Sequence, residues 1–184
     1  MTPRDCLDEA FRRLSRGVAD RRHAFHTPTF ATIGPDGAPE ARTLVLRGFD
    51  AAARTIRLHS DARSGKVVAL LRDPRCALHL YDAGAKLQIR LSGAAEVLGD
   101  ERAEAAWQAS RDFSRMCYAI EPGPGTPVAE PPPAPRDAEA GRPHFRVIAM
   151  VFDVMDWLEL AHDGHRRARF DWRAGALRSD WLVP

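Results

Sequence analysis

Short segments of alternating polarity, separated by turn residues, constrain the fold of this chain most. Residues 55–60 place Ile56 and Leu58 on one face, and residues 86–92 place Leu87, Ile89 and Leu91 on one face. Turn sequences such as Gly34-Pro-Asp-Gly37 lie between such segments. Many short strands at hairpin spacing, with few helical segments, predict a mainly β fold: an antiparallel β-barrel with flanking helices.

The expected elements follow from this alternation and from apolar residues at helical spacing. Strands are expected at residues 29–33, 42–49, 55–60, 76–81, 86–92 with a continuation at 94–98, 166–172 and 177–182. Residues 145–160 predict one long strand or two broken ones, and Gly93 marks a bulge or bend. Helices are expected at 5–22, 64–72 and 100–111, while 112–120 is ambiguous. The N-terminal helical segment, residues 1–28, should end at Thr27-Pro28 and lie outside the barrel.

Length and composition indicate one globular domain, residues 1–184. Apolar residues make up 45% of the chain, enough for a substantial core. The net charge of +2 gives no footprint for bulk nucleic-acid binding. Residues 121–143 are rich in proline and glycine, which predicts a loop within the domain and not a linker between domains.

Cysteine usage and the N-terminus indicate a cytoplasmic protein. Cys6, Cys76 and Cys117 are far apart and form no CxxC motif, so neither a disulfide framework nor a metal quartet is expected. The charged N-terminus has no apolar signal region, and no apolar run is long enough to span a membrane. The histidines show no metal-ligand spacing, so no metal site is expected.

The segment from Arg42 to Lys66 predicts a strand, a turn, a second strand and the start of a helix. It holds six Arg or Lys against two Asp. Ser64 is placed to cap the helix and Lys66 lies in its first turn, beside free N–H groups and the positive end of the helix dipole. This pattern is typical of a phosphate site. Two solvated strand faces and a capped surface helix would give the same spacing, so both interpretations stay open on spacing alone.

Several motifs in this half of the chain appear in a familiar order. They are Arg42-Thr-Leu-Val-Leu-Arg47, His59-Ser60, Ser64-Gly-Lys66, Asp73-Pro74-Arg75 and Gln88. In order and spacing they resemble the flavin-binding half of the pyridoxamine 5′-phosphate oxidase family, which binds FMN in a split β-barrel. The resemblance covers residues 30–98 well and 145–184 loosely. The chain departs from the family pattern at Arg47 (Lys in the family), His59 (another aromatic), Gly65 (Arg) and Leu87 (Arg).

The resemblance implies FMN as cofactor and assigns roles to residues. Arg42, Ser64 and Lys66 would hold its phosphate, and Arg63 would replace the guanidinium missing at Gly65. The main chain from Thr43 to Leu46 would run beside the flavin ring. The full expected cofactor-binding set is Arg42, Thr43, Leu44, Val45, Arg47, His59, Ser60, Ser64, Lys66, Gln88 and Arg169.

The last two members of this set come from the strands beyond the phosphate motifs. Gln88 would bond the polar edge of the ring, and a solvent-facing glutamine is the alternative. Arg169-Phe170 matches the family's final Arg-Phe, so Arg169 would approach the flavin. Trp157 lies two residues further from Arg169 than the family pattern requires, which favours a core or interface tryptophan.

The resemblance further implies an FMN-binding oxidoreductase acting on a small molecule, as a homodimer with FMN at the interface. The alternative is a non-catalytic flavin- or haem-binding module on the same barrel, since fold does not fix function. No catalytic residue, substrate or electron donor is assigned. The family's substrate grip, Y-x-x-x-R-x-x-x-S, is matched only partly by Ser110-Arg111 and Ser114-Arg115. Together with Arg47, this predicts weak or no oxidation of pyridoxamine 5′-phosphate.

Overall fold

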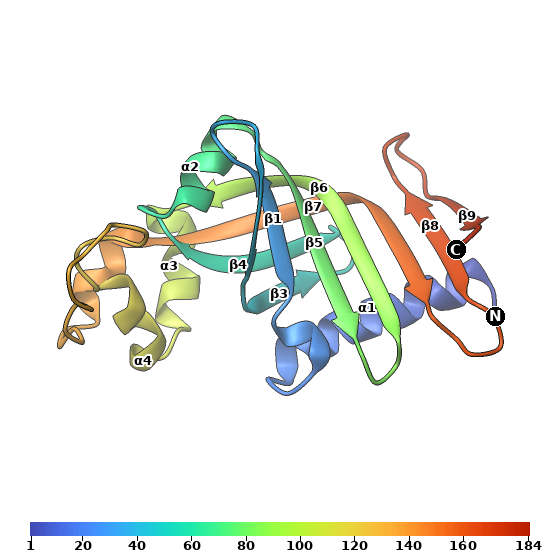
Figure 1. Cartoon of the computed structure of the whole chain (residues 1–184), viewed down its shortest axis with the longest axis horizontal. Coiled ribbons are helices and arrows are strands. Elements are labelled where there is room, and N and C mark those ends of the chain that lie inside the picture. Colours follow the sequence, from blue (N-terminus) through green and yellow to red (C-terminus); the bar gives the residue numbers. More distant parts are fainter.

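One antiparallel sheet of nine strands, curled into a split barrel, dominates the computed structural model, which describes residues 1–184 (Figure 1). The strand order is β2-β1-β5-β6-β7-β4-β3, with β8 paired to β7 and β9 to β8. The strands are β1 (Thr29–Ile33), β2 (Pro39–Thr43), β3 (Leu46–Asp50), β4 (Thr55–Asp61), β5 (Arg75–Asp82), β6 (Leu87–Leu98), β7 (Phe145–Glu159), β8 (Arg166–Asp171) and β9 (Arg178–Leu182). The helices are α1 (Pro3–Ala19), α2 (Gly65–Arg72), α3 (Asp100–Gln108) and α4 (Asp112–Arg115). The predicted fold class is confirmed.

Strands β6 and β7 are long and pair with each other in the middle of the sheet (Figure 1). They connect β5 on one side with β4 and β8 on the other. Residues 145–160 form one strand of 15 residues, β7, instead of two broken ones. The predicted bulge occurs where the register of β6 shifts between Ser92 and Gly93. A Cβ atom at Gly93 would lie 2.0 Å from the carbonyl oxygen of Val151, so only glycine allows the two strands this close approach.

The apolar faces predicted from alternation form the core. Ile56, Leu58, Ile89 and Leu91 are fully buried in a cluster of 24 residues inside the barrel. Trp157 belongs to the same cluster, which confirms a core position for it. A smaller cluster lies between α3 and β7 and consists of Ala103, Trp107, Phe145 and Val147.

The prediction of a single strand at residues 42–49 is wrong. Strand β2 ends at Thr43 and β3 begins at Leu46. Residues 44–45, here called the 44–45 crossing, connect these two strands, which pair with different neighbours. The reason is topological: β2 pairs with β1, whereas β3 pairs with β4 on the other side of the split. The N–H of Leu44 donates to Pro28, and Val45 makes no main-chain hydrogen bond.

The N-terminal helix ends earlier than predicted. Helix α1 stops at Ala19, and the chain turns back into a separate 3-10 turn, Ala24–His26. Gly17 permits this reversal, because a Cβ atom there would lie 2.9 Å from the Cβ of Phe25. As predicted, α1 lies on the outside of the barrel, where it contacts β3 and the strands β7 to β9 (Figure 1).

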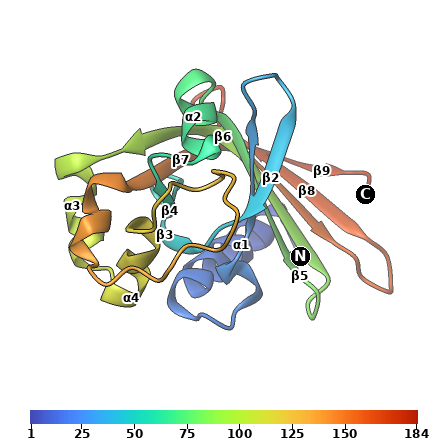
Figure 2. The same cartoon turned by 60° about the vertical axis from the view of Figure 1, so that its left-hand side comes forward.

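The helices beside the proline-rich segment are short. Helix α3 ends at Gln108 instead of residue 111, and the ambiguous 112–120 region forms α4 followed by a 3-10 turn, Met116–Tyr118. The proline-rich segment is a loop, as predicted, until the 3-10 segment Glu139–His144 leads into β7 (Figure 2). No helix of the structure combines the length and apolar character needed to cross a membrane.

Candidate functional site

Four predicted cofactor-binding residues meet at the start of α2: the three phosphate candidates Arg42, Ser64 and Lys66, and Ser60. They are here called the α2 cluster. The Nζ of Lys66 donates to Oγ of Ser60 at 3.3 Å, and the Ser60 and Ser64 hydroxyl oxygens lie 3.1 Å apart. Burial lowers the pKa of Lys66, and the nearby Arg42 guanidinium lowers it further. The cluster therefore holds two cations close together, an arrangement that an anion would stabilise.

Two members of the α2 cluster already have protein partners. Arg42 donates to Oγ1 of Thr32 at 2.8 Å and pairs with Glu40 at 2.6 Å. Ser64 occupies the N-cap position, but its hydroxyl donates to the carbonyl of Asp61 at 2.7 Å and caps no helical N–H. The prediction of Ser64 as a side-chain cap is wrong, because its hydroxyl is directed toward the Asp61 carbonyl and the Ser60 hydroxyl and accepts no hydrogen bond from a helical N–H. The first N–H groups of α2 still lack partners within the helix.

Gly65 leaves an open position beside the α2 cluster. A Cβ atom there would meet no atom within 4 Å. Arg63 does not replace the missing guanidinium. It pairs with Asp61 at 2.8 Å and with Glu121, and donates to Tyr118 and Ile120, so it anchors the start of the proline-rich loop instead.

The crossing at residues 44–45 provides free main-chain groups, as expected for a ring-binding edge. The N–H and C=O of Val45 have no main-chain partner. Thr43, at the end of β2, pairs with Thr29 of β1 and is exposed. These groups can contact a planar ring regardless of the side chains that carry them.

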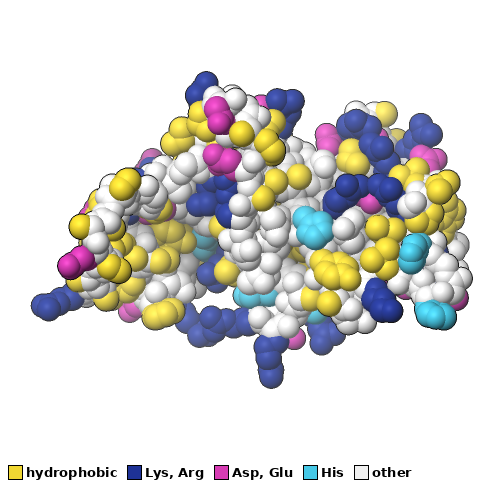
Figure 3. All heavy atoms as spheres, in the orientation of Figure 1, with side chains coloured by type: hydrophobic (Ala, Val, Ile, Leu, Met, Phe, Trp, Pro, Cys, Tyr) yellow, Lys and Arg dark blue, Asp and Glu magenta, His cyan; other side chains and the backbone are white.

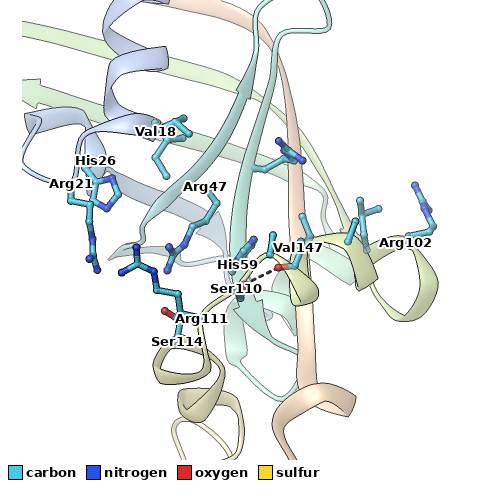
Figure 4. A pocket seen from close by; sticks show the side chains of 16 residues that line it. Val18, Arg21, His26, Arg47, His59, Arg102, Ser110, Arg111, Ser114 and Val147 are labelled. Atoms are coloured by element: carbon cyan, nitrogen blue, oxygen red, sulfur yellow. Dashed lines mark hydrogen bonds between the residues drawn. The ribbon is translucent and has the colours of Figure 1, made fainter. Parts of the chain in front are cut away.

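A cavity of about 520 Å³, here called the cationic cavity, lies among β3, β4, α3, α4 and the end of α1 (Figure 4). Two predicted residues, Arg47 and His59, line it. Its sixteen lining residues include no Asp or Glu, but they include the five arginines Arg21, Arg47, Arg57, Arg102 and Arg111. In the space-filling view, Lys and Arg side chains surround the hollow between the barrel and the α3–α4 region (Figure 3).

Most arginines of the cationic cavity have no acidic partner. Arg102 pairs with Glu96, whereas the other four form no salt bridge in the structure. The side chains of Arg21, Arg47 and Arg111 extend toward one another although they come from three separate segments (Figure 4). A concave surface lined by one sign of charge concentrates ligands of the opposite sign.

His59 forms part of the cavity wall and packs edge-on against Phe145, with ring centroids 4.8 Å apart. Burial lowers the pKa of His59 to about 4, and the Arg47 and Arg57 guanidinium groups add to this effect. The imidazole is therefore neutral at neutral pH, and it can either donate or accept a hydrogen bond.

The sequence interpretation missed most of this cavity. Ser110, Arg111 and Ser114, which match the family's substrate grip only in part, line it together with Arg47. The sequence predicted a helix through residue 111, whereas α3 ends at Gln108 and α4 begins at Asp112, so Ser110 and Arg111 lie between the two helices. Arg57 reaches across Gly48, where a Cβ atom would lie 2.4 Å from its Nε, and no motif in the sequence indicates that contact.

The remaining predicted residues, Gln88 and Arg169, lie on the outer face of the sheet. Oε1 of Gln88 lies 3.1 Å from Nε2 of His79. A pocket of about 370 Å³ on this face is lined by His79, Arg169, Thr29 and Leu182 among others. The Nε of Arg169 is buried without a hydrogen-bond partner. Within one chain, the side chains predicted to bind the cofactor therefore lie in three separate places: the α2 cluster, the cationic cavity and the outer face of the sheet.

No group of three or more His, Cys, Asp and Glu side chains is arranged to hold a metal ion. The α2 cluster and the cationic cavity present guanidinium, ammonium, hydroxyl and imidazole groups, and the 44–45 crossing presents free main-chain groups.

Curated relatives match over half of the chain. A pyridoxine/pyridoxamine 5′-phosphate oxidase from Thermobifida fusca is 35% identical over 100 residues, covering 54% of this chain and 44% of that protein. An enzyme of the same name from Arabidopsis thaliana is 34% identical over 105 residues, covering 53% of this chain and 52% of that protein. The chain spans about half the length of the curated relatives it matches.

Solved structures share the fold along nearly the whole chain. A pyridoxamine 5′-phosphate oxidase-related, FMN binding protein from Nostoc punctiforme superposes with a TM-score of 0.80 at 24% identity, covering 96% of both chains. PhzG from Burkholderia lata superposes with a TM-score of 0.74 at 19% identity, covering 96% of this chain and 91% of that one. These similarities show the split-barrel fold.

The family model described as pyridoxamine 5′-phosphate oxidase, FMN-binding domain, matches residues 8–99. This range contains the α2 cluster, the 44–45 crossing and one wall of the cationic cavity. The chain therefore belongs to the pyridoxamine 5′-phosphate oxidase FMN-binding family.

Proposed function

We propose that this protein is an FMN-binding oxidoreductase that acts on an anionic small molecule. One observation carries the proposal: two cationic sites, the α2 cluster and the cationic cavity, are joined by a stretch of chain with free main-chain groups. The first suits the phosphate of the cofactor and the second suits a substrate. Val45, at the crossing, leaves hydrogen-bonding groups for the ring between them.

The residues present fit FMN. Lys66 is half-buried, donates a hydrogen bond to the Ser60 hydroxyl and forms no salt bridge, so a phosphate would supply a direct counter-charge. The start of α2 adds unpaired N–H groups. When bound, FMN would supply two-electron, hydride-accepting chemistry at the ring. The protein would hold and orient the cofactor and the substrate, and the neutral imidazole of His59 would offer a hydrogen bond within the cavity.

We also propose a homodimer with FMN at the subunit interface. The support is the exposed outer face that carries Gln88 and Arg169, where the Nε of Arg169 is buried but unpartnered. Trp181 of the neighbouring β9 edge is 45% exposed, and a second copy would cover it. Light scattering of the FMN-loaded protein should give twice the chain mass. A monomer at micromolar concentration with flavin fully bound would contradict the dimer.

The test of the proposed function begins with the purified protein. It should retain or take up FMN, give a yellow flavin spectrum, and lose that colour when a reductant is supplied. Reduction should be screened with NADH and NADPH, followed by reoxidation in air. A protein that takes up no flavin would refute the proposal, and a Soret band would assign the barrel to haem instead.

A further inference from the structure

We propose that the cationic cavity selects a small molecule that carries two anionic groups and that it excludes amines. This inference rests on the proposed function, because it names the substrate class of the same site. The starting observation is the charge of the lining: five arginines and no Asp or Glu.

Four of the five cavity arginines form no salt bridge, whereas 13 of the other 20 arginines of the chain pair with a carboxylate. Arginines elsewhere commonly have close carboxylate partners, such as Asp82 for Arg13 and Asp156 for Arg167, both at 2.9 Å or less. In the cavity, Arg21, Arg47, Arg57 and Arg111 lack such partners. Like charges gathered in a concavity repel one another, and a bound anion removes that cost.

The cavity presents its arginines on two opposing walls. Arg47 and Arg57 come from β3 and β4, and both act on the pKa of His59, which places them on one wall. Arg111 comes from the start of α4 and lies beside the hydroxyls of Ser110 and Ser114 on the other.

Arg21 approaches from the segment after α1, near the gap between the two walls (Figure 4). Because a guanidinium binds a carboxylate or phosphate through two parallel hydrogen bonds, each wall accommodates one anionic group.

Volume and polarity further define the ligand. A cavity of about 520 Å³ is in the usual range for small-molecule sites, about 300–1,000 Å³. Leu46, Leu98 and Val147 supply apolar surface for the body of the ligand. An ammonium group would find no carboxylate here, and the neutral His59 offers no compensating negative charge. Desolvating a cation among arginines is strongly unfavourable.

Isothermal titration of the FMN-loaded full chain tests the inference with three probes that share one ring: isophthalate, benzoate and benzylamine. Isophthalate should bind at least tenfold more tightly than benzoate, and benzylamine should show no binding. Raised salt should weaken isophthalate more than benzoate. Phenyl phosphate, in a separate arm, shows whether one dianionic phosphate can replace two carboxylates. Equal affinities for benzoate and isophthalate, or measurable benzylamine binding, would overturn the inference.

Single variants then locate the two anion positions. Arg57→Gln and Arg111→Gln should each weaken isophthalate at least tenfold and benzoate less. Arg21→Gln should also weaken isophthalate, whereas Arg22→Gln, one residue along and outside the cavity, is the matched control and should match the wild type.

Affinity for FMN, titrated separately, should be unchanged in all four variants. If the chain takes up no FMN but, titrated without it, still binds isophthalate, the proposed function alone is refuted. A chain that binds FMN but no isophthalate would refute this inference alone. Equal loss in Arg22→Gln and Arg21→Gln would mean that general surface charge, and not the cavity, attracts the anion.

Discussion

The ammonium of Lys66 lies 3.3 Å from the hydroxyl oxygen of Ser60, and no carboxylate forms a salt bridge with it. Burial and the Arg42 charge both lower the pKa of Lys66, and the Asp61 carboxylate only partly offsets them. Arg42, in contrast, is balanced by Glu40. Within the α2 cluster, Lys66 therefore carries the charge that a cofactor phosphate would neutralise.

Lys66→Ala should weaken FMN binding and leave riboflavin binding nearly unchanged, because the two flavins differ only by the phosphate. Charge-assisted hydrogen bonds contribute roughly 1.5–3 kcal/mol each, so the loss for FMN should be on the order of tenfold to a hundredfold. In the wild type, several such bonds should favour FMN over riboflavin by about a hundredfold or more. Fluorescence quenching measures all four affinities.

The outcomes of that titration separate two roles of the residue. Equal loss of both flavins in Lys66→Ala would mean that Lys66 supports the fold and not the phosphate. Equal wild-type affinities for the two flavins would mean that the start of α2 is not a phosphate site.

His59 should make the protein less stable as the pH falls from 6.5 to 4. Its folded pKa is about 4, below the ordinary value of 6.5, because of burial and the Arg47 and Arg57 charges. In this window the unfolded chain binds the proton more strongly than the folded chain does, so the free energy of unfolding decreases as protons are added. The full effect is on the order of 3 kcal/mol, at about 1.4 kcal/mol per unit of pKa.

Urea unfolding at several pH values tests this linkage. His59→Asn should lose less stability between pH 6.5 and 4 than the wild type does, whereas His165→Asn, at an exposed position, should follow the wild type. Parallel pH profiles for His59→Asn and the wild type would contradict the assignment.

Local alternation and turn chemistry predicted most of the sheet, because strand faces that repeat every two residues are recorded directly in the sequence. Ile56 with Leu58 and Ile89 with Leu91 are buried as that pattern requires. The 44–45 crossing was missed because nothing local distinguishes a strand that changes partners from one that continues. The chain changes partners here because β2 pairs with β1 and β3 pairs with β4. Pairing between segments that are distant in the sequence is decided by the tertiary structure.

The candidate site divides in the same way. The α2 cluster was predictable, since Ser60, Ser64 and Lys66 are close in the chain. The cationic cavity was not, because Arg21, Arg57 and Arg111 come together only when α1 and α3 pack against the barrel. These three arginines share the lack of a carboxylate partner. This property cannot be read from the sequence, because it depends on where the fold places each Asp and Glu.

The bulge at Gly93 should tolerate no side chain. A Cβ atom would lie 2.0 Å from the Val151 carbonyl and 2.7 Å from the Phe152 Cα, both main-chain atoms of β7. Gly93→Ala should therefore destabilise the protein by about 2 kcal/mol or more. Gly84→Ala is the control, since its Cβ would make an ordinary 3.4 Å contact with Asp82 and should change stability by less than about 0.5 kcal/mol. Similar unfolding midpoints for the two variants in urea would refute this account of the bulge.

Gly65 stands where the family carries an arginine, and this position should limit FMN affinity. A Cβ atom at Gly65 meets nothing within 4 Å, and Arg63, its neighbour in sequence, is held by Asp61 and Glu121. Gly65→Arg should therefore fit without strain and add one charge-assisted contact to the phosphate. The gain for FMN should be about tenfold or more, at roughly 1.5–3 kcal/mol for such a contact.

Riboflavin affinity should not change in Gly65→Arg, since riboflavin has no phosphate. Gly65→Ala is the matched control: it should raise helix stability by up to about 1 kcal/mol and leave both flavin affinities unchanged. If Gly65→Arg and Gly65→Ala bind FMN equally well, the added guanidinium does not reach the phosphate, and the cofactor phosphate does not lie at the start of α2.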